Sequence, residues 1–204
     1  TSQGCSSCPP ADRLAAQLAE RDDVIVVSRP VTYWDRLGWK DTLALPANTD
    51  LQRAYAKRGL DGRNGVYTPQ IVANGASGTV GSREQAIEDM IAAETDSAVS
   101  LRVERDDNGE ISVAITGDAT GSATLSLLAL DSEASVPIGR GENGGRTVRY
   151  TNVLKGERAI ADWQGDTNPI AIPADRFRFE GADRYALILR EGASGRVLAA
   201  RYVH

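Results

Sequence analysis

The sequence contains few of the residues that usually bind metals or catalyse hydrolysis: two cysteines, one histidine and one methionine among 204 residues. The histidine is His204, the last residue. Ser-His-Asp and Cys-His catalysis therefore lack a base, and a structural zinc site lacks the four nitrogen or sulfur ligands that it needs. The longest apolar run, residues 24–27, is far shorter than the roughly 20 residues of a membrane-spanning helix. We expect no cofactor and no membrane insertion.

The charge and composition of the chain are those of an ordinary folded protein. The net charge is -5 and the isoelectric point is near 5.0, with lysine and arginine scattered along the chain. Nucleic-acid binding needs a clustered basic face, so we expect no nucleic-acid partner. Hydrophobic residues make up 41% and charged residues 25%, which disfavours disorder. The length of 204 residues favours two domains.

The first half of the sequence alternates between helical and extended patterns. Leu14, Ala15 and Leu18 have helical spacing after two prolines, which the first turn of a helix tolerates. The run VIVV, residues 24–27, is typical of a strand covered on both faces. Further along we expect a helix over 48–58 that ends at Gly59, a hairpin over 70–81, and a helix to Ala93 that starts with a capping box of Ser82 and Gln85.

From about Thr95 the hydrophobic pattern has a period of two, and no further helix is expected. Seven or so short strands with turn residues between them indicate an antiparallel sandwich. The glycine-rich stretch RGENGGR, Arg140 to Arg146, does not lie between a strand and a helix as a phosphate-binding loop does. Ordinary turn chemistry makes it a loop between strands. We expect domains at 1–96 and 97–204.

The two cysteines form the most informative motif, because Cys5 and Cys8 stand three positions apart, directly before Pro9 and Pro10. At a helix start, unpaired N–H groups and the helix dipole stabilise a thiolate, so Cys5 would be the attacking thiolate and Cys8 the resolving thiol. A structural disulfide stays open, although it would close a very short loop and add little stability. A metal site also stays open, as copper bound by two thiolates and a distant histidine.

The order of the motifs resembles that of the thioredoxin superfamily, in which a cis-proline lies against the cysteine pair and the residue before it meets the substrate. These two residues would be Pro69 and Thr68 here. The resemblance implies an α/β thioredoxin-like domain, with a mixed sheet flanked by helices, followed by an all-β antiparallel sandwich domain. That fold places a strand before the cysteine loop. The sequence starts too late to contain it, so we expect a trimmed strand or a sheet completed otherwise.

Four stretches carry a more specific resemblance: TSQGCSSCPPADRL, YWDRLGWKD, GVYTPQ and RGENGGRT. Together they resemble a family of mostly bacterial secreted or periplasmic proteins, domain-of-unknown-function family 1223, over nearly the whole chain. The resemblance implies a periplasmic or secreted location and gives no settled biochemical role. Members of that family usually carry His and Asp around the YWD motif, where this sequence has residues 28–32 as SRPVT.

With those two groups absent, proton transfer at Cys8 would rely on Asp12, one helical turn further along, or on Asp35 or Asp41 in the aromatic loop. A carboxylate at position 12 is otherwise a solvated or capping group. Four aromatic side chains either form an apolar rim that grips an extended peptide or simply pack in the interior. They are Tyr33, Trp34, Trp39 and Tyr67.

The sequence therefore predicts thiol-disulfide exchange with a protein or a small-molecule thiol or disulfide. Cys5 would attack, Cys8 would resolve, and Thr68 and Pro69 would position the substrate. The alternative is a non-catalytic binding module that keeps an inert disulfide and holds a partner through its aromatic loop. A copper carrier is the lesser alternative. The substrate, the direction of electron flow and the oligomeric state stay open.

Overall fold

The computed structural model describes residues 1–63, 65–94, 98–107, 109–117 and 121–203. The chain forms two compact units: unit 1 is Thr1–Glu94 with Asp131–Leu154, and unit 2 is Thr95–Leu130 with Lys155–His204. Residues 131–154 therefore belong with the N-terminal part of the chain. The expected domain boundary between residues 96 and 97 lies outside the described residues, as does His204.

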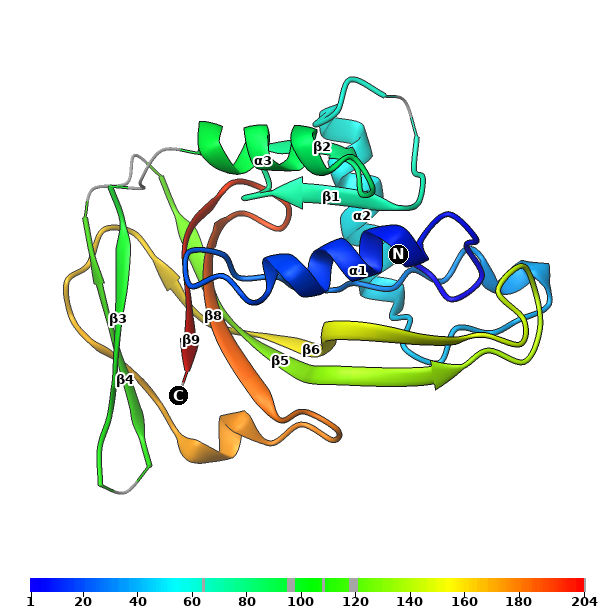
Figure 1. Ribbon diagram of the computed structural model, residues 1–204. Helices are drawn as coiled ribbons and strands as arrows, with labels where there is room; N and C mark the ends of the chain where they lie inside the picture. The colour runs from blue at the N-terminus through cyan, green and yellow to red at the C-terminus, as the bar shows by residue number, and fades with distance from the viewer. Residues whose placement is uncertain (64, 95–97, 108, 118–120, 204) are drawn as a thin grey trace. The chain divides into compact units, whose positions relative to one another are not determined.

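Unit 1 contains three α-helices and a two-stranded antiparallel sheet (Figure 1). Leu14 and Leu18 of α1 form a buried cluster with Ile87 of α3, so two separate helices share one small core. In chain order the elements are α1 (Pro9–Leu18), the 3-10 helix η1 (Asp35–Leu37), α2 (Pro46–Arg58), β1 (Gln70–Ala73), β2 (Ser77–Val80) and α3 (Glu84–Ala93).

Local signals account for most of these elements. Helix α2 has Pro46 at its first position and ends at Gly59, whose backbone is left-handed with a φ of 66°, as the sequence predicts. The β1–β2 turn uses left-handed backbone at Asn74 and Gly75, which suits a tight hairpin. The predicted capping box at Ser82 is wrong, because α3 starts at Glu84 and has no side-chain cap.

Residues 24–27 do not form the predicted strand. The adjacent Ser28 makes one isolated parallel bridge, to Val153 in strand β6 (Thr147–Trp163). The Ser28 N–H donates to the carbonyl of Asn152 at 2.9 Å, and the N–H of Leu154 donates back to Ser28 at 2.9 Å. Asn152 has left-handed backbone with a φ of 49°. This residue lies next to the bridge within the continuous strand β6, and residues 24–27 belong to none of the described strands.

Unit 2 is built from antiparallel strands in two sheets, with orders β3-β4-β7 and β6-β5-β8-β9. The end of the long strand β5, the start of the long strand β6 and the loop between them make up residues 131–154, which belong to unit 1. The remaining elements are β3 (Ser100–Arg105), β4 (Ile111–Thr116), β5 (Ala123–Pro137), β7 (Ile170–Ile172), the 3-10 helix η2 (Ala174–Phe177), β8 (Arg184–Glu191) and β9 (Val197–Val203).

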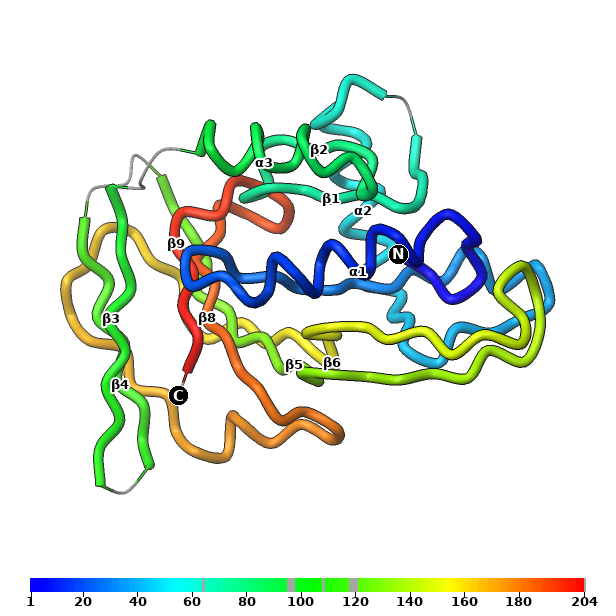
Figure 2. Tube along the Cα trace, viewed as in Figure 1, coloured from blue at the N-terminus to red at the C-terminus, as the bar shows by residue number. Residues whose placement is uncertain are grey.

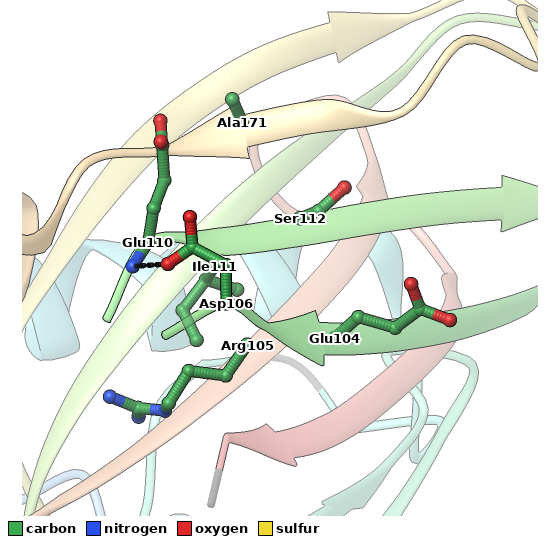
Figure 3. A pocket seen from close by; sticks show the side chains of 7 residues that line it. All are labelled: Glu104, Arg105, Asp106, Glu110, Ile111, Ser112 and Ala171. Atoms are coloured by element: carbon green, nitrogen blue, oxygen red, sulfur yellow. Dashed lines mark hydrogen bonds between the residues drawn. The ribbon is translucent and has the colours of Figure 1, made fainter. Parts of the chain in front are cut away.

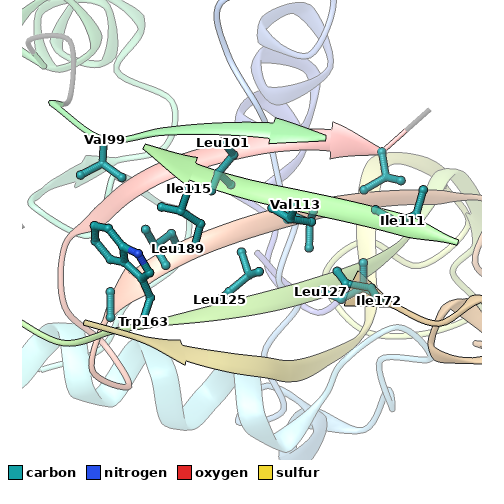
Figure 4. Close-up of a cluster of buried hydrophobic side chains, with 13 residues drawn as sticks. Val99, Leu101, Ile111, Val113, Ile115, Leu125, Leu127, Trp163, Ile172 and Leu189 are labelled. Atoms are coloured by element: carbon teal, nitrogen blue, oxygen red, sulfur yellow. The ribbon is translucent and has the colours of Figure 1, made fainter. Parts of the chain in front are cut away.

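One hydrophobic core joins the two sheets of unit 2 (Figure 4). Strand β4 alternates, with Ile111, Val113 and Ile115 buried and the residues between them more exposed, which is the period-two pattern of a half-buried strand. These side chains meet Leu125 of β5 and Leu189 of β8 in the same cluster. The apolar faces of the two sheets are therefore packed together.

Shortening Ile115 to valine is expected to lower the free energy of unfolding by about 1 kcal/mol, because a buried methylene is lost from a packed core. Ile115 is 2% exposed. Urea denaturation of the variant measures the change, with Thr116→Ser at the exposed next position as the control. Equal stability of the two variants would contradict the burial of Ile115 in this core.

The predicted fold class is wrong. The described residues form three antiparallel sheets, and unit 1 has no mixed sheet flanked by helices. Strand β1 pairs with β2, and the segment expected to be the central strand contributes a single bridge, so a thioredoxin-like sheet does not form. Among the described helices, none has the length and apolar character that crossing a membrane requires.

Candidate functional site

Cys5 and Cys8 form a disulfide in the loop that precedes α1, with their Cα atoms 5.4 Å apart. The N–H of Cys8 donates to the carbonyl of Cys5 at 3.1 Å, so residues 5–8 form a hydrogen-bonded turn. Both cysteines are 0% exposed, whereas Ser6 and Ser7 between them are exposed. The Ser7 hydroxyl lies 3.4 Å from the Cys5 sulfur, so Ser7 is part of the cover over the disulfide.

Helix α1 gives the cysteines less electrostatic support than the motif suggests. Cys8 is the N-cap residue, and Pro9 and Pro10 are the first two helical residues. The positive end of a helix dipole resides on its unpaired N–H groups, and proline has none. Of the first three helical residues, Ala11 alone carries an N–H group. The sequence-based expectation for Cys5 did not take these two missing donors into account.

Asp12 lies one helical turn beyond Cys8, and its carboxyl group is buried. Its side chain is 6% exposed, and its Oδ2 atom finds no hydrogen-bond partner among the described residues. Burial raises the pKa of Asp12 to about 6, although the neighbouring Thr1 lowers it; the nearby Asp41 adds a smaller increase. The Asp12 N–H donates to the Cys8 carbonyl at 3.0 Å, and helical side chains lean toward the N-terminus of their helix, which here is the end that carries Cys8. A solvated or capping role does not fit this environment.

Two other carboxyls came from the sequence, Asp35 and Asp41: Asp35 accepts the N–H of Asp41 at 3.1 Å, and Asp41 is bonded to the cysteine loop. It is 3% exposed and accepts the N–H of Gln3 at 2.8 Å and that of Leu43 at 2.9 Å. Burial raises its pKa. Because its two bonds fix loop backbone, Asp41 supports the site, whereas Asp12 keeps an unpaired oxygen.

Trp39 connects the cysteine loop to a buried hydrophobic cluster of unit 1. Its indole N–H donates to the side-chain oxygen of Gln3 at 2.8 Å, and its ring packs against the cluster formed by Ile138 and Tyr150. A Cβ atom built on Gly139 would lie 3.1 Å from that ring, so the backbone approaches the indole closely. These contacts are those of a packed side chain, and Trp39 is partly buried; its role in holding a substrate stays a prediction.

Trp34 and Thr68 connect the aromatic loop to the Thr-Pro loop. The Trp34 indole N–H donates to the Thr68 hydroxyl at 2.8 Å, and the Thr68–Pro69 peptide bond is cis. A Cβ atom on Gly4 would lie 3.2 Å from the Cβ of Trp34, so Trp34 also lies against the cysteine loop. The structure therefore brings Cys5, Trp34 and Thr68 into one neighbourhood.

Pro69 lies close to α1. It is buried, and a Cβ atom built on Gly81 would approach both Pro69, at 3.2 Å, and Ala11, at 3.1 Å. The absence of a side chain at position 81 thus lets the Thr-Pro loop and the first turn of α1 come together. Pro69 and the cysteine-bearing end of α1 share this part of unit 1.

Tyr33 and Tyr67 carry hydroxyl groups that have no hydrogen-bond partner among the described residues. The Tyr67 carbonyl accepts the side-chain N–H of Gln52 at 2.6 Å, and the guanidinium of Arg63 lies 4.9 Å from the centre of its ring. Burial and the nearby Asp61 raise the pKa of Tyr67 to about 12. Burial also raises the pKa of Tyr33, so both hydroxyls are neutral at physiological pH, and both are buried inside unit 1.

The loop between β5 and β6 contributes two residues that sequence reasoning missed. The Asn143 side-chain amide donates to the carbonyls of Gln3, at 3.0 Å, and Cys5, at 2.9 Å. The Glu142 carboxylate accepts the N–H of Ser6 at 3.1 Å. Figure 2 shows this loop, in yellow-green, beside the dark blue N-terminal loop. The expectation of a plain turn left these contacts out, although RGENGGRT is among the four distinctive stretches.

Unit 2 has a pocket of its own, lined by none of the cysteine-loop residues. It measures about 270 Å³ and lies at the β3–β4 hairpin (Figure 3), where Asp106 accepts the N–H of Glu110 at 2.8 Å. None of the predicted site residues lines it. Among the described residues no group of three or more His, Cys, Asp or Glu could hold a metal ion. The copper alternative relied on His204, which lies outside them.

The comparisons with known proteins give a family and a structural relative. Residues 1–190 match the family described as protein of unknown function DUF1223, so the chain belongs to that family. A crystal structure of protein AGR_C_4864 from Agrobacterium tumefaciens is 28% identical in sequence and superposes with a TM-score of 0.83. The match covers 100% of this chain and 90% of that one. No curated protein matches the chain.

Proposed function

We propose that the protein is a thiol-disulfide exchange protein whose Cys5–Cys8 pair reacts with a thiol or disulfide on a protein or a small molecule. The observation that carries the proposal is Asp12, a buried carboxyl with an unpaired oxygen one turn beyond Cys8. Titratable groups perturbed by burial beside a reactive pair are typical of functional sites. A pKa of about 6 suits a group that exchanges protons near neutral pH.

The free energies of the disulfide and of the buried Asp12 carboxyl argue against a purely structural disulfide. Closing a loop of four residues contributes about 2 kcal/mol in the chain-entropy description. Ionising Asp12 in the folded state, with its pKa raised from 3.8 to about 6, costs about 3 kcal/mol above pH 7. The carboxyl thus destabilises the fold by as much as the disulfide stabilises it. If the disulfide served only to stabilise the fold, an apolar residue at position 12 would make the protein more stable.

The proposed reaction proceeds in two steps. A substrate thiolate attacks the Cys5 sulfur, the Cys5–Cys8 bond breaks, and Cys8 leaves as a thiolate that takes a proton. A second substrate thiolate then attacks the substrate sulfur of the mixed disulfide and releases Cys5. Two substrate thiols become one disulfide, and the two cysteines become thiols. In the reverse direction the Asp12 carboxylate accepts the proton of Cys8 as Cys8 attacks the mixed disulfide.

Access to the sulfurs requires the cysteine loop to open, since both cysteines are fully buried. Ser6 and Ser7 are the exposed part of that loop, and displacing Ser7 uncovers the Cys5 sulfur first. Thr68 would then meet the substrate, and the rings of Tyr33 and Tyr67 would line its apolar side. A periplasmic or secreted location, implied by the family resemblance, would supply the oxidising environment in which the disulfide persists.

Wild-type protein is expected to equilibrate with mixtures of reduced and oxidised glutathione and to accelerate reduction of a model protein disulfide at least tenfold over background. Alkylation and mass spectrometry measure the thiol content, and a variant with serine at both Cys5 and Cys8 is the control. Equal rates for the wild type and that variant would contradict the proposal.

A binding role is the second candidate. Among the described residues, the exposed large hydrophobic side chains are Leu37 and Val66. Leu37 follows Trp34 by three residues and Val66 precedes Thr68 by two, and these two loops are joined by the Trp34–Thr68 hydrogen bond. An apolar segment of a partner suits such a pair. A protein that binds a partner with both cysteines replaced by serine, and never exchanges with glutathione, would favour this candidate.

A further inference from the structure

We propose that the loop over residues 140–146 is a clamp that holds the cysteine loop closed and stabilises the disulfide over the dithiol. The inference rests on the proposed exchange function for its use by the protein. It adds a positioning residue, Asn143, and a means of setting the reduction potential from a distant part of the chain. Its test is an equilibrium measurement that requires no turnover.

The Asn143 side chain joins the cysteine loop to its own loop, because its amide oxygen accepts an N–H of the Arg146 guanidinium at 3.4 Å. Asn143 is 1% exposed, and its amide nitrogen reaches the carbonyls of Gln3 and Cys5. The Cys5 carbonyl also accepts the N–H of Cys8. The Asn143 amide is thus attached to the turn that brings the two sulfurs together, and water cannot replace it without opening the site.

Glu142 holds the exposed side of the same loop. Its carboxylate accepts the N–H of Ser6 at 3.1 Å, and hydrogen bonding from Ser6 lowers the pKa of Glu142. Asn143 and Glu142 therefore hold the cysteine loop on its buried side and on its exposed side. The bonds fix backbone from residue 3 to residue 6.

The clamp is rigid before it meets the cysteine loop. The N–H of Ile138 donates to Arg146 at 2.8 Å, that of Gly145 donates back to Ile138 at 2.8 Å, and that of Gly144 donates to Gly141 at 3.0 Å. Gly141 and Gly145 have φ values of 80° and 79°, which glycine adopts without strain. Ile138 is buried in a cluster packed on Trp39. A preorganised loop loses little entropy when it binds.

The redox state and the clamp are coupled because two separate thiols need more room than a bonded pair. Reduction moves the sulfurs apart and shifts the turn to which Asn143 is bonded, so the clamp bonds are strongest in the disulfide form. By linkage, a bond that favours the disulfide form lowers the reduction potential, and reduction in turn weakens the clamp. Glutathione supplies the electrons: two thiols are oxidised to one disulfide as Cys5 and Cys8 become thiols.

An Asn143→Ala variant is expected to shift the glutathione equilibrium toward the dithiol at least tenfold, because each buried hydrogen bond contributes severalfold to such a constant. A tenfold shift raises the reduction potential by about 30 mV. The variant should also lose more stability in its oxidised form than in its reduced form. A merely structural role would lower both stabilities equally and leave the potential unchanged.

The matched control is Asn168→Ala, at an exposed position of unit 2, which should leave the potential unchanged. If Asn143→Ala does not fold, Glu142→Ala decides, with a smaller shift in the same direction expected. The clamp proposal is wrong if the reduction potential of Asn143→Ala, or of Glu142→Ala where Asn143→Ala does not fold, equals that of the wild type. If the potential shifts but the wild type fails to turn over a substrate, the clamp stands and the proposed function fails.

Discussion

A Cys8→Ser variant should accumulate a mixed disulfide at Cys5 and turn over only through the slow attack of an external thiol on that bond. Reduced Cys5 can still attack oxidised glutathione, forming the mixed disulfide and releasing one glutathione thiol. Without Cys8 no internal thiol resolves that bond. Turnover should fall by more than about 10³-fold, because removing a nucleophile leaves only background exchange. Mass spectrometry of the variant should show one glutathionyl adduct per chain.

The assignment of roles follows from what covers each sulfur. Cys5 lies beside the hydroxyl of the exposed Ser7, whereas Cys8 is the N-cap residue of α1, one turn before the buried Asp12. A Cys5→Ser variant, which keeps Cys8, should therefore form the adduct much more slowly. Ser7→Ala keeps both sulfurs and should still turn over. Faster adduct formation in Cys5→Ser than in Cys8→Ser would reverse the two roles.

Elements whose conformation is set by residues close to them in the sequence could be predicted from the sequence. The left-handed glycine that ends α2 and the Asn74–Gly75 turn of the first hairpin are set within a few residues, and the structure has both. The strand at residues 24–27 could not be judged in this way, because a strand requires a partner. The bridge beside this segment joins Ser28 to Val153, far along the chain, and it is isolated. The expected thioredoxin-like sheet failed for the same reason.

The candidate site shows a similar division. The spacing of Cys5 and Cys8 and the Thr68–Pro69 pair pointed to residues that the structure gathers in unit 1, and their roles stay predictions. Asn143 was missed because it lies 138 residues from Cys5, within a stretch whose glycines read equally well as a plain turn. The sequence feature that could have identified Asn143 is a polar residue among the glycines of one of the four distinctive stretches. Its hydrogen-bond partners are far away in the sequence, so they could be found only from the folded structure.

The second large effect is expected at Asp12. An Asp12→Asn variant should exchange about 10²-fold more slowly at pH 7, because a positioned general base contributes at least that much. Wild-type exchange should rise as pH increases through about 6, the pKa to which burial raises Asp12. The variant should lose that step. Rates of glutathione exchange measured from pH 5 to pH 8 test both statements, and an unchanged profile would exclude Asp12 as the proton carrier.

Stability should change in the opposite direction to activity. The folded pKa of Asp12 lies above its ordinary value of 3.8, so the folded state binds a proton more tightly than the unfolded state does. The free energy of unfolding therefore falls as pH rises from about 4 through about 6. Asparagine removes this loss, so the free energy of unfolding of the variant should match that of the wild type near pH 4 and exceed it by about 3 kcal/mol at pH 8.

The control for this stability measurement is Asp22→Asn, at an exposed position. A variant that is slower but no more stable at pH 8 would mean that Asp12 is not held as a buried charge. A gain in stability together with a loss of exchange would show that the buried carboxyl is kept at the expense of the fold.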